Sequence, residues 1–152
     1  MLAGRILADG VRLVATIAVI LLVGTLLGFR ITGSTLAVVG GLLLGIAFGM
    51  ALSWVAAFIG LSVRNPETAQ SAGFIWMFPL TFASSVFAQP QTMPAWLQPF
   101  VRVNPITVAA DSLRGLLLGG AVLAPVLKTL LWIVVLTVIF APLVIRQYRR
   151  LA

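Results

Sequence analysis

The side chains that could do acid–base or metal chemistry are few in this sequence. The 152 residues include three acidic residues, Asp9, Glu67 and Asp111, and neither histidine nor cysteine occurs. Catalysis and metal binding need such groups in clusters, and these three carboxylates lie far apart in the sequence. We therefore predict no catalytic residue, no metal site and no cofactor held by this chain itself.

One polar segment is a candidate for contact with another molecule rather than for catalysis. It covers residues 64–70 and contains the polar side chains Arg64, Asn65, Glu67 and Thr68. Pro66 disfavours helix at the residue before it and suits the first turn of a new helix. Glu67 complements the positive end of that helix dipole. The pattern predicts an exposed turn that opens a helix.

The composition places these polar residues in a very apolar chain. Hydrophobic residues make up 61% of the sequence and charged residues 9%, whereas soluble domains carry about 25% charged residues. The net charge of +7 comes from basic residues scattered between apolar runs. Because no stretch gathers them, they indicate membrane topology and headgroup anchoring rather than nucleic-acid binding.

Four apolar runs predict an all-α integral membrane protein with a single transmembrane domain over residues 1–152. The expected spans cover about residues 12–29, 35–63, 71–87 and 122–145. The first has roughly 18 residues, which rise about 27 Å as a helix and suffice to cross the hydrocarbon core. An even number of spans puts both termini on one side, and the basic cluster over residues 146–150 indicates that this side is cytoplasmic.

The segment of about residues 90–120 contains a helix too short to cross a membrane. Asn104 and Pro105 form a helix start, an N-cap followed by proline at the first helical position. We expect a short extracellular hairpin that is re-entrant or interfacial. Asp111 and Arg114 can pair on one face of it. Ionisable groups near a membrane are functional candidates, although an interfacial helix needs a polar face in any case; both interpretations stay open.

Small residues recur at every fourth position of the second span. They include Gly41, Gly45, Gly49 and Ser53. Four residues are close to one helical turn, so these positions share one face, where small side chains let backbones approach closely in lipid. Tight helix packing is the preferred interpretation, and a face that slides during transport is the alternative.

The third span mixes aromatic side chains with hydroxyl groups around a proline. The residues of interest are Phe78, Pro79, Phe82, Ser84 and Ser85. A proline inside a membrane helix kinks it and is tolerated where neighbours or a cavity satisfy the freed carbonyl. Lipid contact explains the aromatic residues, whereas hydroxyl groups beside a kink favour a cavity, and the sequence leaves both open.

The order and spacing of several motifs prompt a family resemblance. The motifs are GLSVRNPETAQ from Gly60 to Gln70, followed by Phe78-Pro79-Leu80, then Met93-Pro94-x-Trp96-Leu97 and Asn104-Pro105. Together they resemble the C-terminal part of a type-two ABC transporter permease of the daunorubicin-resistance exporter branch. The resemblance covers essentially the whole chain, and residues 4–9 resemble the entry to that family's third span.

The resemblance implies an architecture of six spans with both ends cytoplasmic. A short extracellular helical hairpin would lie between the fifth and sixth spans. By that comparison this chain holds the third to sixth spans, and the first two, with the main cytoplasmic coupling helix, would be missing.

The resemblance also implies partners and residue roles. A second permease subunit would complete a homodimer or heterodimer, and separate ABC ATP-binding subunits would hold ATP and magnesium. The ATPase contact would be Arg64, Asn65, Glu67 and Thr68. The translocation pathway would include Phe78, Pro79, Phe82, Ser84 and Ser85. The outer lid would be Asn104, Pro105, Asp111 and Arg114.

The leading hypothesis is therefore a permease subunit of an ATP-driven exporter in the inner (plasma) membrane. It would move a hydrophobic compound, such as a drug, an antibiotic or a lipid-like molecule, out of the cell. The alternative is a membrane scaffold that only assembles with partners, since small-residue faces suit both. A membrane enzyme is disfavoured because the acidic residues form no cluster.

Overall fold

The computed structural model describes residues 2–151 of the predicted domain, and these residues are mostly helical. The elements in chain order are α1 (Leu2–Leu26), α2 (Thr35–Ser62), α3 (Pro66–Phe82), the 3-10 turn η1 (Pro90–Thr92), α4 (Gln98–Val103), α5 (Pro105–Leu118) and α6 (Leu123–Leu151). The described part of the chain contains no strand, which confirms the predicted all-α fold class.

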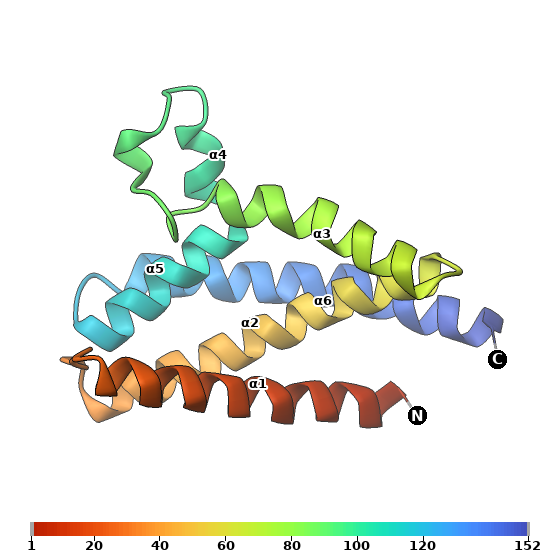
Figure 1. The fold of residues 1–152 in the computed structure, drawn as a ribbon, viewed down its shortest axis with the longest axis horizontal. Coiled ribbons are helices and arrows are strands. Elements are labelled where there is room, and N and C mark those ends of the chain that lie inside the picture. Colours follow the sequence, from red (N-terminus) through yellow and green to blue (C-terminus); the bar gives the residue numbers. More distant parts are fainter. Residues whose placement is uncertain (1, 152) are drawn as a thin grey trace.

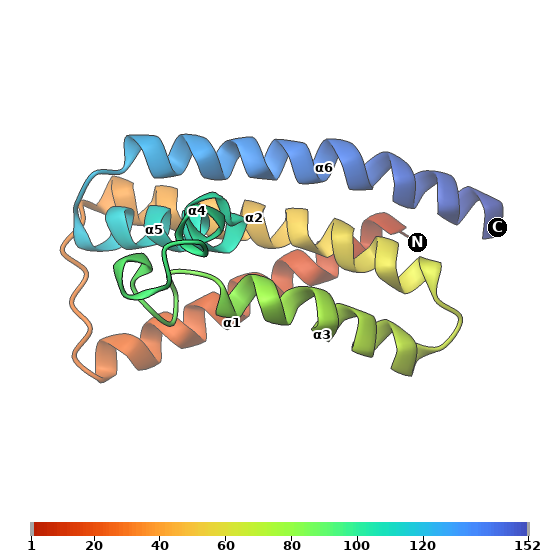
Figure 2. The same cartoon turned by 90° about the horizontal axis from the view of Figure 1, so that it is seen from above.

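The long helices α1, α2, α3 and α6 run along one axis (Figure 1). The start of α1, the end of α6 and the turn between α2 and α3 lie at the same end of this bundle, which we call the terminal end (Figures 1 and 2). Three helices are long and apolar enough to cross a membrane: Ala3–Leu26, Thr35–Ser62 and Leu123–Arg150. The second and third of these have 28 residues each and rise about 42 Å, which exceeds the thickness of about 30 Å of the hydrocarbon core.

The first and last long helices, α1 and α6, extend further toward the chain termini than their apolar runs predict. The first was expected at residues 12–29 and runs from Leu2 to Leu26, and the last was expected at 122–145 and runs from Leu123 to Leu151. The apolar pattern marks the depth of the hydrocarbon, whereas a helix continues into the headgroup layer, where charged side chains are solvated and remain good helix formers. The second helix, predicted at 35–63, ends at Ser62.

The third helix is shifted relative to its prediction of 71–87. It begins at Pro66, which occupies the first helical position, and ends at Phe82 after 17 residues. Pro79 lies inside it. At about 1.5 Å per residue it spans about 26 Å, shorter than α2 or α6. It stops partway along the bundle, where α5 begins (Figure 1).

Helix α5 occupies the half of the bundle that α3 does not reach. It packs on both α2 and α6 and ends beside the turn that joins α1 to α2. The backbone N–H groups of Thr32 and Gly33 both donate to the Leu117 carbonyl, at 3.1 and 2.9 Å. Helices α3 and α5 therefore follow one another along the bundle as a broken crossing, and η1 and α4 project sideways at the break (Figure 1).

The packed core lies between α2 and α6. Ala51, Val55 and Leu136 are buried there, and partly buried Trp76 and Trp132 pack against them. By contrast, no described side chain of α1 is buried, and α1 packs on α2 alone. Helix α3 buries none of its side chains either. Among the described residues, α2, α5 and α6 therefore form a packed unit. Helices α1 and α3 lie against this unit without burying side chains of their own.

Candidate functional site

The break between α3 and α5 is joined by one buried carboxamide. Asn104 caps α5, because its Oδ1 accepts from the Ile106 N–H at 2.9 Å. Its Nδ2 donates to the carbonyls of Leu80 and Ala83, both at 2.7 Å. The side chain is 7% exposed. One residue therefore satisfies orphan groups at the C-terminal end of α3 and at the N-terminal end of α5, and we call this place the α3–α5 junction.

Hydroxyl groups extend the α3–α5 junction on the side of α5. The Ser85 N–H donates to Thr107 Oγ1 at 3.0 Å, and Ser85 Oγ donates to Asp111 Oδ1, also at 3.0 Å. Ser84 and Ser85 are buried, and Ser84 Oγ accepts from the Val86 N–H at 3.3 Å. A buried polar group without a partner is costly, so this network fixes the path of the chain after α3.

Asp111 also pairs with Arg114, at 3.2 Å between Oδ1 and Nη1. The two side chains are 40% and 53% exposed, and exposed pairs at this helical spacing contribute only a few tenths of a kcal/mol. The bond from Ser85 rather than the ion pair therefore ties Asp111 to the α3–α5 junction.

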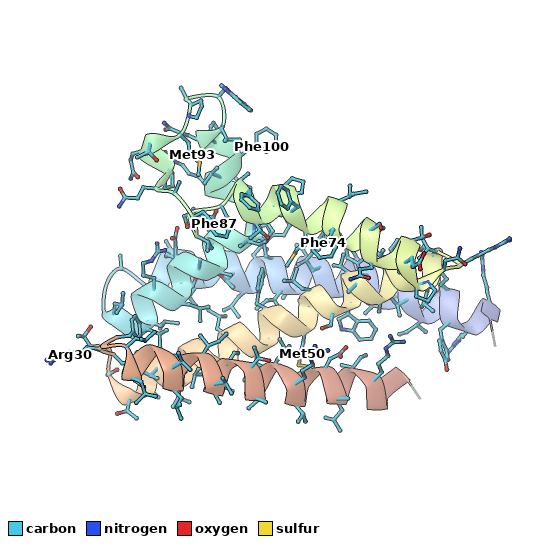
Figure 3. All side chains as sticks on the ribbon, viewed as in Figure 1. Arg30, Met50, Phe74, Phe87, Met93 and Phe100 are labelled. Carbon is cyan, nitrogen blue, oxygen red and sulfur yellow. The ribbon has the colours of Figure 1, made fainter. Side chains whose placement is uncertain are left out.

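The residues predicted to line a pathway divide into two groups. Ser84 and Ser85 lie in the α3–α5 junction, whereas Phe78 and Phe82 are exposed. The ring of Phe82 stacks on Phe87 with centroids 5.1 Å apart and approaches Phe78 at 4.2 Å. Figure 3 shows Phe100 on the part of the chain that extends away from the long helices and Phe87 at the base of that part, near the ends of α3 and α5. The phenylalanines thus form an apolar outer surface, and Pro79 lies inside α3 between Phe78 and Phe82.

The polar segment predicted to contact an ATPase lies at the terminal end of the bundle. Arg64, Asn65, Glu67 and Thr68 are all exposed, and Asn65 makes no side-chain cap bond to α3. These side chains are therefore available at a sharp turn between two long helices, away from the α3–α5 junction (Figure 1).

The small residues of α2 face two different helices. A Cβ added at Gly41 or Gly45 would lie 3.3 Å from Leu116 or 3.5 Å from Leu113 of α5, and one at Gly49 would lie 2.8 Å from Leu13 of α1. Ser53 Oγ instead donates to the Gly49 carbonyl at 3.1 Å. The stripe therefore gives the bulky leucines of its neighbours room to approach α2.

Several polar contacts of the bundle were not predicted from the sequence. Thr129 Oγ1 and Ser112 Oγ lie 2.8 Å apart, and both residues are fully buried between α6 and α5. Trp132 Nε1 donates to the Val103 carbonyl at 3.1 Å, and Gln147 Nε2 donates to the Leu61 carbonyl at the end of α2, also at 3.1 Å. For Thr107 of the α3–α5 junction alone, the sequence does indicate a shared site, because residues 104, 107 and 111 lie on one helical face.

Residues 1–118 match the family described as ABC-2 type transporter. This chain belongs to that family. Its helices and this membership make it a multi-pass membrane protein. No group of three or more His, Cys, Asp or Glu that could hold a metal ion occurs among residues 2–151.

Individual relatives of this ABC-2 type transporter chain include permeases named for drug resistance. It is 40% identical, over 97% of its length, to the daunorubicin resistance ABC transporter permease protein DrrB1 of Streptomyces coeruleorubidus, covering 52% of that protein. It is 27% identical, over 98% of its length, to a probable doxorubicin resistance ABC transporter permease protein, DrrC of Mycobacterium tuberculosis, covering 54% of it. The chain thus spans about half the length of these curated relatives. No solved structure matches it significantly.

Proposed function

We propose that this chain forms membrane-spanning helices of a permease subunit for ATP-driven export of a hydrophobic compound. The proposal rests on the family match together with the broken membrane crossing formed by α3 and α5, whose facing ends meet at the buried, polar α3–α5 junction. Discontinuous membrane helices place helix ends and polar groups at membrane depth, where transporters bind or gate their substrates. Relatives named for daunorubicin and doxorubicin resistance support drug-like compounds as the substrate class.

The proposed moving part is α3. It buries no side chain, whereas α5 is packed on α2 and α6 and linked to α6 by the Ser112–Thr129 bond. Segments with few buried contacts open at the least cost in free energy. In this proposal α3 separates from α5 at the junction while α2, α5 and α6 stay together. The phenylalanines at positions 78 and 82 would then line the pathway with the newly exposed serines, and residues 104–114 would act as the outer lid.

The energy for this motion would come from a separate ABC ATP-binding subunit that holds ATP and magnesium. Its proposed contact is the segment of residues 64–68, because this segment is exposed and charged and contains the turn before α3 and the first residues of that helix. A second permease subunit would face the apolar surface of α3. The terminal end would face the cytoplasm of a cell whose plasma membrane holds the complex, because basic residues 146, 149 and 150 gather there.

The test is drug-stimulated ATP hydrolysis by the permease assembled with its ATP-binding subunit in liposomes. The proposal predicts that daunorubicin raises the hydrolysis rate and enters inside-out vesicles only when ATP is present. Replacing both charges of the turn, by Arg64→Gln with Glu67→Gln, should abolish most of the stimulation while membrane insertion stays normal.

A matched variant removes two charges away from that turn, at Arg30, which Figure 3 places at the opposite end of the bundle, and at the exposed Arg102 of α4. Stimulation should persist in Arg30→Gln with Arg102→Gln. Assembly with the ATP-binding subunit in the absence of any drug response would identify the chain as a scaffold instead.

A further inference from the structure

A cavity of about 800 Å³ opens at the terminal end of the bundle. Its walls come from α1, α2, α6 and the start of α3. Three arginines line it, Arg5 and Arg12 from α1 and Arg64 from the turn before α3, together with a single carboxylate, Asp9. Tyr148 of α6 closes another side. The lining therefore carries a net positive charge of two at neutral pH.

Within residues 2–151, these arginines have no partner of opposite charge at ion-pair distance. Among residues 2–151 the ion pair that forms is Arg114 with Asp111, far from this cavity. Asp9 is not paired with either arginine of its own helix, although it lies four residues after Arg5 and three before Arg12. Guanidinium groups bind phosphate with charge-assisted, often bidentate hydrogen bonds. Three of them around one cavity favour an anion that carries a phosphate.

An apolar groove continues from this cavity along the bundle. It has a volume of about 480 Å³ and lies between α1 and α3, which do not contact each other, with α2 as its floor. The two cavities share five lining residues: Leu13, Ser53, Ala56, Gly60 and Ala69. Phe74, Trp76 and Met77 of α3 line the apolar part. The combined site has a cationic mouth at the end of the membrane helices and an apolar body within them.

We infer that this site binds an anionic phospholipid, with its phosphate among Arg5, Arg12 and Arg64 and an acyl chain in the groove between α1 and α3. The charge of the cavity favours an anionic lipid over other ligands. A zwitterionic lipid has no net charge to attract it to a lining of charge +2, and a cationic drug is repelled. Depth agrees as well, because headgroups lie at the ends of membrane-spanning helices and acyl chains lie alongside them. The inference does not depend on the proposed export function.

The test is native mass spectrometry of the intact chain released from nanodiscs that contain equal parts of phosphatidylglycerol and phosphatidylcholine. We expect retained phosphatidylglycerol and no comparable phosphatidylcholine. Arg5→Gln with Arg12→Gln should weaken retention about thirty-fold, since a basic residue near an anionic headgroup contributes about 1 kcal/mol and 1.4 kcal/mol is tenfold. The matched control is Arg146→Gln with Arg149→Gln, which removes the same charge at the same end outside the cavity and should leave retention unchanged.

A second variant probes the groove without changing charge. Gly73 lines the groove, and a Cβ added there meets no atom within 4 Å, so the backbone has room for a side chain. Gly73→Leu should therefore place its side chain in the groove and also displace the lipid. Gly4→Leu, which is equally unobstructed and lies outside both cavities, serves as its control. Equal retention of the two lipids, equal loss in the Arg146 control, or displacement by inorganic phosphate would overturn the inference. Retention undiminished by Gly73→Leu would also overturn it.

Discussion

Replacing Asn104 with Ala should lower the free energy of unfolding by about 3 kcal/mol or more, because each buried polar group left without a partner costs about 1–3 kcal/mol. The substitution removes the two bonds to the Leu80 and Ala83 carbonyls and the cap on the Ile106 N–H. All three groups belong to helix ends that have no intrahelical partner for them. The change is measured by unfolding the purified chain in mixed detergent while its tryptophan fluorescence is followed.

Asn104→Asp separates the two functions of the Asn104 side chain, the cap on α5 and the hydrogen bonds to the end of α3. Aspartate keeps an oxygen that can cap α5, but it sets a second carboxylate oxygen against the two carbonyl oxygens that accepted from the amide. We therefore expect a loss at least as large as for Asn104→Ala, although aspartate is as good an N-cap as asparagine. Gln98→Ala is the control, since it removes a single hydrogen bond from a side-chain amide, which Gln98 Nε2 donates to the Met93 carbonyl at 3.1 Å. If Asn104→Asp matched the control, Asn104 would be a cap and nothing more.

Replacing Gly33 with Ala should be nearly as damaging, by about 3 kcal/mol, at the upper end of what overpacking costs. A Cβ at this position would overlap the Leu116 carbonyl oxygen and would lie 3.2 Å from that of Leu117. Both are backbone atoms, so no side-chain rotation relieves the clash. The turn would have to move away from α5 and give up its two bonds to the Leu117 carbonyl.

Gly40→Ala provides the matched control on α2. A Cβ there meets no atom within 4 Å, and alanine is favoured over glycine inside a helix by about 0.5–1 kcal/mol. We expect this variant to be as stable as the parent chain or slightly more so. Equal effects of Gly33→Ala and Gly40→Ala, measured by the same detergent unfolding, would contradict the docking of the turn onto α5.

The long helices could be predicted because their residues carry the information locally. Apolar runs predict α2 to within one residue at its end, and Asn104 with Pro105 predicts the start of α5. Asp111 and Arg114 pair because helical spacing alone brings them together. In each case the residues that decide the structure are close neighbours in the sequence.

The end of α3 could not be predicted for the opposite reason. The apolar pattern continues to Phe87, yet the helix stops at Phe82. The carbonyls released there are satisfied by Asn104, more than 20 residues later. A similar separation hides the Ser112–Thr129 bond and the bond from Gln147 to the end of α2. Sequence patterns show that such polar residues need partners, but only the packed helices show which partners they meet.

The Arg-lined cavity was missed because its residues are ordinary when taken singly. Arg5 and Arg12 are among the scattered basic residues that indicate membrane topology, and Arg64 belongs to an exposed turn. The structure places them around one space because α1 continues as helix through its charged first turns. Their shared function depends on the bounds of α1, which the apolar pattern did not define.

The most direct test of the account is a reversible link across the α3–α5 junction. The chain contains no cysteine, so Ser85→Cys with Thr107→Cys can be joined by a short thiol-specific reagent, because the backbone N–H of Ser85 lies 3.0 Å from Thr107 Oγ1. Ser112→Cys with Thr129→Cys joins α5 to α6 across a contact of 2.8 Å and is the control. Both pairs are made in the complete permease with its ATP-binding subunit, and drug uptake into inside-out vesicles is measured. The account predicts that linking 85 to 107 stops uptake until the link is reduced, while linking 112 to 129 leaves uptake intact; undiminished uptake with 85 joined to 107 would contradict it.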